Sequence, residues 1–398
     1  MKLIFMKKNK TNIITYTLIF VVFIIIIFMI INKREMVNDY DAHERNSIEF
    51  KKTQIISTLS DQADKTKNLI WCPSFQIAWN ELKSYIHEDI KLDVTNELIE
   101  NLNKSADYKT LLPQDSYYVF SGIIKEQDLN KIYSDIFDKF NVSLKIPELL
   151  EAQNNSLLFL SYFFMKIKFY KEFNQNNQPL IFNYSNATCE INSFGILADD
   201  EFKYNDLRDK VKILYIKENA ITKTFDEVII DPDYDESNEV QLVLAMTEFK
   251  NNLNETANYV IDKLKIFRSK KDKENELPQI INNVCESYNH EFNSTDTLLI
   301  PNINFKITHD LTNIKNKVIL NQSLNNTKIN NAIQVINFNL NRKGVELSST
   351  AFINVGCKGG HFEFDQPFLI MLKSRHSDVP YFVLWIANDE LLSKYKKL

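Results

Sequence analysis

Glycine, proline and cysteine are all scarce in this sequence, and each scarcity excludes a class of protein. The 398 residues include only 6 glycines and 9 prolines, which excludes collagen-like and low-complexity chains. The 4 cysteines are far apart and form no C-x-x-C pair, so the chain is not a small disulfide scaffold. Outside the cell, Cys72, Cys189, Cys285 and Cys357 could form disulfides, but we favour buried or half-buried thiols.

Familiar catalytic and metal motifs are missing as well. The sequence has no G-x-G-x-x-G, P-loop, H-E-x-x-H or G-x-S-x-G. Calcium-loop spacing begins at Asp231, but Glu236 stands where glycine is needed and Leu242 where the bidentate glutamate belongs. We interpret this acidic run as a solvated turn. Cys357 and His361 lie four residues apart and could form a thiol–imidazole nucleophile or half a zinc site. We favour a structural role for the pair and predict no enzyme, no cofactor and no metal.

Aromatic residues are abundant, and the charge is unevenly distributed. The 28 Phe, 17 Tyr and 3 Trp residues suffice for a large core, which excludes a disordered chain. Residues 1–33 hold five lysines and no acid, so the rest of the chain has ten more acidic than basic residues. Nucleic-acid affinity comes mainly from phosphate neutralisation, so we predict no nucleic-acid partner.

One long apolar run predicts a membrane anchor. Residues 13–31 contain no charge and as a helix would span about 28 Å, close to the bilayer core. Lysines precede the run and acids soon follow it, which favours a cytoplasmic N-terminus and a body outside the membrane. A cleaved signal peptide is the alternative, but the length of the run and its β-branched end favour an uncleaved signal-anchor. The predicted parts are a cytoplasmic basic tail (1–12), a single-pass anchor (13–31), a juxtamembrane linker (32–46) and one extracellular domain (47–398).

Periodicity in the body predicts an α+β fold with large mixed or antiparallel sheets and helices mainly in the N-terminal part. Apolar residues recur at helical spacing in four windows: 75–86, 129–140, 253–267 and 280–288. Strands are expected at 117–124, 157–164 (continuing through 166–169), 211–216, 227–231, 241–246, 297–300, 333–340, 368–373 and 381–386.

These segments resemble those of the serpin family, in their order and in their amino-acid sequences, along nearly the whole body. Residues 50–56 resemble the first family helix. Residues 68–74 resemble its N-[IV]-x-x-S-P-x-S turn, with Cys72 in place of serine, and 157–166 resemble its long central strand. Further matches occur at 202–204 with 211–216 and at 298–305. K-G-V-E at 343–346 resembles the start of the family's reactive loop, and F-D-Q-P-F-L-I at 364–370 resembles the strand that follows it.

The resemblance implies a loop that, once cut by a protease, inserts into the main sheet and traps that protease. The loop-like segment here contains Glu346, Ser348, Ser349, Thr350, Ala351, Phe352, Ile353, Cys357 and His361. The four small residues suit insertion, but the large Phe352 and Ile353 follow at once and would strain the sheet. The 18 steps from Glu346 to Phe364 reach roughly 60 Å when extended, which is short for the family.

Two further features indicate a reduced mechanism. Only 16 residues separate Phe140 from Leu157, where the family has a strand and a helix across the front of the main sheet, so we expect that cover to be missing. Gly359 and Gly360 suit a tight turn, which favours a short strand-like connection over a bait loop.

These observations predict a membrane-anchored, non-enzymatic, serpin-like binding or structural module in which loop insertion is lost or impaired. The alternative is a working inhibitor of serine or cysteine proteases at the cell surface. A third class is a Cys/His hydrolase. The expected partners are a protein, protease or other, and the membrane through residues 13–31.

Overall fold

A computed structural model describes most of the chain after residue 43. The described ranges are 44–104, 107–143, 156–165, 168–197, 205–219, 221, 224–270, 279–281, 284–324, 327–344 and 360–396. The predicted tail and anchor lie outside these ranges, so they stay predictions. Within the described residues, no helix has the length and apolar character needed to cross a membrane.

The described residues form three sheets, and the first, here called the main sheet, has the strand order β1-β14-β15-β5-β4. Its strands are β1 (Glu44–Asn46), β14 (Ile303–Asp310), β15 (Ile329–Leu340), β5 (Leu157–Phe164) and β4 (Tyr117–Ile123). The pairs β1–β14 and β15–β5 are parallel, whereas β14–β15 and β4–β5 are antiparallel. The last three residues of the predicted linker therefore already belong to this sheet.

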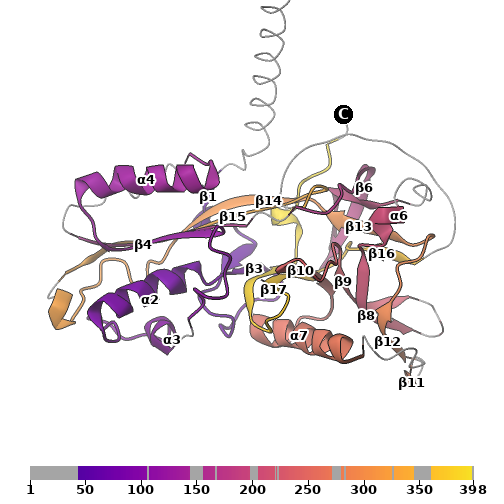
Figure 1. Cartoon of the computed structure of the whole chain (residues 1–398), viewed down its shortest axis with the longest axis horizontal. Helices are drawn as coiled ribbons and strands as arrows, with labels where there is room; N and C mark the ends of the chain where they lie inside the picture. The colour runs from indigo at the N-terminus through magenta and orange to yellow at the C-terminus, as the bar shows by residue number, and fades with distance from the viewer. Residues whose placement is uncertain are drawn as a thin grey trace, which may run out of the picture. The chain divides into compact units, whose positions relative to one another are not determined.

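Helices lie on both faces of the main sheet (Figure 1). On one face, α2 (Ser74–Ile86) stacks Trp79 against Phe159 of β5, with the ring centroids 5.4 Å apart, and α3 (Glu97–Lys104) lies next to α2. On the other face, α4 (Glu126–Phe140) places Phe140 5.1 Å from the ring of Tyr162. All eight residues of β5 are buried as a result. This corrects the expectation that the front of the sheet lacks a cover, because the second predicted helix supplies it.

The second sheet has the order β11-β12-β8-β9-β10-β17-β18-β3-β2. Its strands are β11 (Gln279–Ile281), β12 (Val284–His290), β8 (Lys212–Asn219), β9 (Phe225–Asp231), β10 (Val240–Met246), β17 (Phe368–Ser374), β18 (Pro380–Ile386), β3 (Asn68–Trp71) and β2 (Thr53–Ile55). Helix α7 (Leu253–Lys270) covers one face with an apolar stripe that includes Leu253, Val260 and Leu264.

The third sheet has the order β16-β13-β7-β6. Its strands are β16 (His361–Glu363), β13 (Thr297–Pro301), β7 (Ala187–Ile196) and β6 (Asn174–Tyr184). Four short helical elements complete the described structure: α6 (Asn205–Arg208), η1 (Ser47–Glu49), η2 (Gln322–Leu324) and η3 (Asp389–Leu391). One large apolar cluster draws on all three sheets, with Phe338 from the main sheet, Phe382 from the second and Phe194 from the third.

The predicted α+β class with mixed sheets is confirmed, and so are most predicted strands and three of the four helices. The prediction of a helix at 280–288 is wrong, because these residues contribute to β11 and β12. Strand β12 pairs with the exposed edge of β8, where Tyr288 lies opposite Tyr215, and this pairing outweighs the helical spacing. Residues 50–56 are not the first family helix either, because Thr53–Ile55 form β2 beside β3.

Candidate functional site in the main sheet

The predicted reactive-loop-like segment falls almost wholly outside the described residues. Of its nine residues, only His361 is described, in β16, and the other eight are not. The structure does describe the two ends between which the segment runs, Gly344 after β15 and Gly360 before β16. It also describes the main-sheet strands beside which an inserted loop would have to lie.

A tight turn ends the described chain after β15. Asn341 and Gly344 exchange two backbone hydrogen bonds, of 2.8 and 2.9 Å, and Gly344 has a φ of 107°, which suits glycine. The segment after β5 holds this turn, because the Phe169 N–H donates to Lys343 O and the Phe173 N–H donates to Arg342 O. The exit from β15 is therefore fixed by backbone bonds to a neighbouring segment.

The return into β16 is also fixed. The Gly360 N–H donates to Asp296 Oδ1 at 2.7 Å, and His361 Nδ1 lies 2.9 Å from Thr297 Oγ1. His361 is exposed, and its strand runs parallel to β13. This position gives His361 a structural partner. The proposed nucleophile pair stays a prediction, since Cys357 is not described.

Strands β5 and β15 form a parallel pair in the middle of the main sheet, with one irregularity in the register between Ile329 and Asn331. The register runs from Leu157 opposite Ile329 to Phe164 opposite Asn337. Any strand that entered between them would first have to separate this pair. The site is therefore closed in the described structure.

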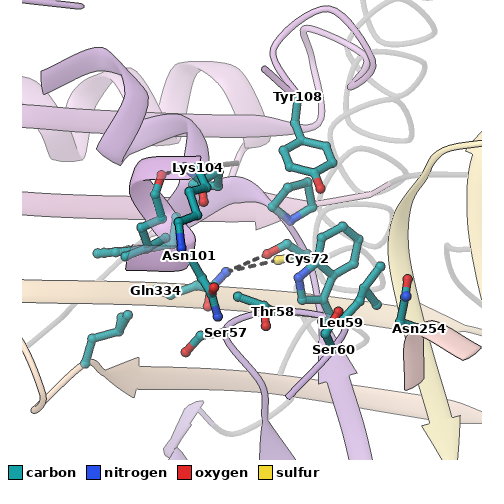
Figure 2. A pocket seen from close by; sticks show the side chains of 16 residues that line it. Ser57, Thr58, Leu59, Ser60, Cys72, Asn101, Lys104, Tyr108, Asn254 and Gln334 are labelled. Atoms are coloured by element: carbon teal, nitrogen blue, oxygen red, sulfur yellow. Dashed lines mark hydrogen bonds between the residues drawn. The ribbon is translucent and has the colours of Figure 1, made fainter. Parts of the chain in front are cut away.

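A buried polar cluster crosses this pair at its centre. Ser161 of β5 and Gln334 of β15 are opposite one another in the register, and Ser74 at the start of α2 contacts both. Ser74 Oγ donates to Ser161 Oγ at 3.3 Å, and Gln334 Nε2 donates to Ser74 Oγ at 3.1 Å. Gln334 Nε2 also lies 3.2 Å from the carbonyl oxygen and from the sulfur of Cys72 (Figure 2). We call Cys72, Ser74, Ser161 and Gln334 the central cluster.

The central cluster is a set of structural contacts rather than a nucleophile. Its side chains are all buried, and burial raises the pKa of the Cys72 thiol to about 11. A thiol with such a pKa stays protonated at neutral pH, and the thiolate is the reactive form. The three described cysteines, Cys72, Cys189 and Cys285, are free thiols, in line with the preferred prediction.

The acidic run at the end of β9 is only partly the solvated turn that we expected: Glu236 and Glu239 are exposed, but Asp231 and Asp233 are buried. Asp231 is 1% exposed and forms a 3.0 Å ion pair with Arg375 through Oδ2, and Gln241 Nε2 donates a 3.0 Å hydrogen bond to the same oxygen. Asp231 ends a strand in the interior of the second sheet, which explains its burial. Burial also raises the pKa of the neighbouring Asp233 to about 6. Among the residues that the structure describes, no group of three or more His, Cys, Asp or Glu side chains could hold a metal ion.

The sequence resemblance pointed to Cys72 and Ser74, but the partner Gln334 was missed. A signal existed, since Gln334 is a lone amide within the apolar stretch 333–336, and Ser161 is the one small polar residue within 157–164. Isolated polar residues in a buried strand require hydrogen-bond partners.

Among the comparisons with known proteins, only the one with solved structures finds similar proteins. No family model matches the chain, and no curated protein matches it by sequence. The solved structures similar to it include Serpin48, a highly specific serpin of the insect Tenebrio molitor, at a TM-score of 0.45 and 12% identity over 81% of this chain and 92% of that one. Human glycosylated kallistatin matches at 0.48 and 10% over 81% and 92%. Thyroxine-binding globulin in complex with thyroxine matches at 0.42 and 12% over 81% and 93%.

The structure search thus returns the family that the sequence resembles. These similarities concern the fold alone, because the identities are low and the TM-scores lie below 0.5. The functional proposals therefore rest on the described residues of this chain.

Proposed function

We propose that this chain is a membrane-anchored, non-enzymatic, serpin-like protein that acts as a binding or structural module, with loop insertion lost or impaired. One observation carries the proposal: the central cluster joins β5 to β15 at the point where an inserted strand would enter. Ser74 bonds to both strands from α2, so the two strands and the helix are held as one unit.

The cost of insertion lies in the cluster and in the packing. An inserted strand would form backbone hydrogen bonds with β5 and with β15, and these would replace the bonds that now join the two strands. Insertion therefore causes no net loss of backbone hydrogen bonds. The contacts of Gln334 with Ser74 and Cys72 have no such replacement, because β5 and β15 would move apart by one strand spacing of about 5 Å to admit the new strand. Each unsatisfied buried group costs about 1–3 kcal/mol.

The predicted loop residues make this cost larger. Phe352 and Ile353 are adjacent in sequence, so in a strand they would point to opposite faces of the sheet. Both faces are covered, by α2 on one side and by α4 on the other. A bulky side chain forced into packed surroundings typically costs 1–3 kcal/mol, and here each face would have to accept one.

The membrane part of the proposal rests on the uncharged run at 13–31 and the lysines before it. The N-terminus is cytoplasmic and the body lies outside the membrane. The test is alkaline extraction of membranes combined with external protease. The body should stay with the membrane at high pH and be digested from outside, whereas release by alkali would contradict the anchor.

Site-specific nicking tests the loss of insertion. A recognition sequence for a specific protease is placed between Ser348 and Phe364 of the full chain, and the melting temperature is measured before and after cleavage. The same sequence in the β6–β7 turn at Asn186, which is exposed, is the matched control. Both cleavages should leave the melting temperature nearly unchanged. A rise of about 10 °C or more after loop cleavage alone would show insertion and defeat the proposal.

A protease inhibitor is the second candidate, and the small residues at 348–351 favour it. Incubation with a panel of serine and cysteine proteases distinguishes the two. A covalent, SDS-resistant complex supports the inhibitor, while degradation or indifference supports the module. For the third class, a hydrolase, any activity that a Cys357→Ala variant retains in full cannot come from that thiol.

A further inference from the structure

A cavity of about 290 Å³ lies directly beside the central cluster. In Figure 2, Asn101 and Lys104 of α3 lie on one side of it and Leu59 and Ser60 on the other, with Cys72 and Gln334 between them. The floor belongs to the buried cluster, and the rim includes the exposed Ser60 and Lys104. The cavity therefore leads from the surface to the middle of the main sheet. Its volume is at the small end of the range for ligand sites.

The near absence of charged side chains in the cavity lining disfavours charged ligands. No Asp or Glu lines it, and Lys104 is the one cationic side chain among its lining residues. That ammonium lies at the rim, 74% exposed, with Glu100 at 3.6 Å. A charged group would have to leave water without a counter-charge in the interior, which is strongly unfavourable.

Aromatic side chains form one wall of the cavity. Trp71 and Tyr108 line it with their rings edge to face, at a centroid distance of 5.7 Å, and Phe75 lies nearby in the lining. Such a wall offers a flat apolar surface and ring edges to a planar ligand.

Some polar side chains that line the cavity are available to form hydrogen bonds with a ligand. The indole of Trp71 and the carboxamides of Asn101 and Asn254 have no side-chain hydrogen bond to any other residue that the structure describes. Trp71 is only 3% exposed, but its indole nitrogen keeps contact with solvent, so a ligand in the cavity would replace water at this N–H. The two amides offer both donors and acceptors.

We infer that this cavity binds a small, uncharged ligand made of one planar ring that carries an amide or hydroxyl group. The ring packs against Trp71 and Tyr108, and the polar group bonds to the amides at the rim or to the Trp71 N–H. This site does not depend on the proposed function. Because Cys72 and Gln334 form its floor, an occupant also contacts both the start of α2 and β15 and stabilises the folded body.

Three isosteric probes test the charge selectivity on the full chain in detergent. Benzamide is uncharged, benzoate is anionic and benzylamine is cationic at neutral pH. Ligand-observed NMR should show benzamide binding at millimolar concentration, with a rise in melting temperature and with both charged probes about tenfold weaker or more. Equal binding of either charged probe, or no binding of benzamide, would overturn the inference.

Two variants locate the site. Ser60→Trp should fill the mouth from an exposed position and abolish benzamide binding, and Asn101→Leu should weaken it by about tenfold. Asn186→Leu, in the exposed β6–β7 turn, is the matched control and should bind like the unmodified chain. Since Ser60 is exposed, its replacement keeps the test valid even if Asn101→Leu does not fold. Undiminished binding in the Ser60 variant would place benzamide elsewhere and refute the site.

Discussion

Replacing Gln334 by leucine removes the one side chain that links β15 to α2 in the central cluster. The amide nitrogen of Gln334 lies 3.1 Å from Ser74 Oγ and 3.2 Å from both the carbonyl oxygen and the sulfur of Cys72. Gln334 is 4% exposed, so water does not readily replace these contacts in the variant. We expect Gln334→Leu to lower the free energy of unfolding by about 1–3 kcal/mol, the usual cost of unsatisfied buried groups.

Urea unfolding followed by fluorescence measures this loss. The midpoint should fall while the slope with urea stays constant, because the surface exposed on unfolding hardly changes. Asn337→Leu is the matched control on the same strand. Its buried amide has one long contact, 3.5 Å to the hydroxyl of Tyr162, and should cost less than about 1 kcal/mol.

A double-mutant cycle tests whether the cluster acts as a unit. Ser74→Ala and Gln334→Leu remove both ends of one hydrogen bond, so the double variant should lose less than the sum of the two single losses, by at least about 0.5 kcal/mol. Strictly additive losses, or a Gln334 variant as stable as the Asn337 control, would refute the view that this cluster holds β15 to α2.

For three further substitutions the structure predicts whether the free energy of unfolding rises or falls. Burial raises the pKa of Asp233 to about 6. The folded state therefore binds more protons than the unfolded state between about pH 4 and 6, and the stability that this carboxyl contributes falls as the pH rises through that window. Asp233→Asn should therefore be more stable at pH 7 by about 1–2 kcal/mol in urea unfolding, with no gain at pH 4; a gain that is equal at both pH values would contradict this. Arg375→Met leaves the carboxylate of Asp231 buried without its ion partner and should cost about 3–5 kcal/mol at pH 7, and a loss below about 1 kcal/mol would show that the pair is unimportant. Phe140→Ala should cost about 3–5 kcal/mol in the same assay if α4 covers the main sheet, and a neutral result would show that it does not.

Strands that are buried on both faces were predictable from the sequence, because they form continuous apolar runs. The apolar run 157–164 coincides with β5, although the strand was predicted to continue through 166–169 and β5 ends at Phe164; 381–386 match β18 to within one residue. The strands β6 and β7 were not predicted. β6 begins with the polar run N-Q-N-N-Q and has only two fully buried positions, and β7 has one Asn, one Ser and one Gly among its apolar residues, so no clear alternation marks either strand.

Only the part of the central cluster that lies within one short stretch of sequence was predictable. The turn at 68–74 contains Cys72 and Ser74 as a recognisable pattern, whereas their partners lie 87 and 260 residues away from Ser74 along the chain. The burial of Asp231 was missed for a similar reason, because Arg375 is 144 residues distant. Periodicity describes one segment at a time and contains no information about which segments meet.

The position of β18 has a consequence for how the protein is made. This strand lies between β17 and β3 in the second sheet, although β3 ends at residue 71 and β18 begins only at residue 380. While the ribosome is still adding these residues, β17 and β3 have no common neighbour, and each presents an unpaired strand edge. This part of the sheet can therefore assemble only after β18 has been synthesised. A premature stop codon before residue 380 would leave a nascent product with two open edges, which favours aggregation over folding.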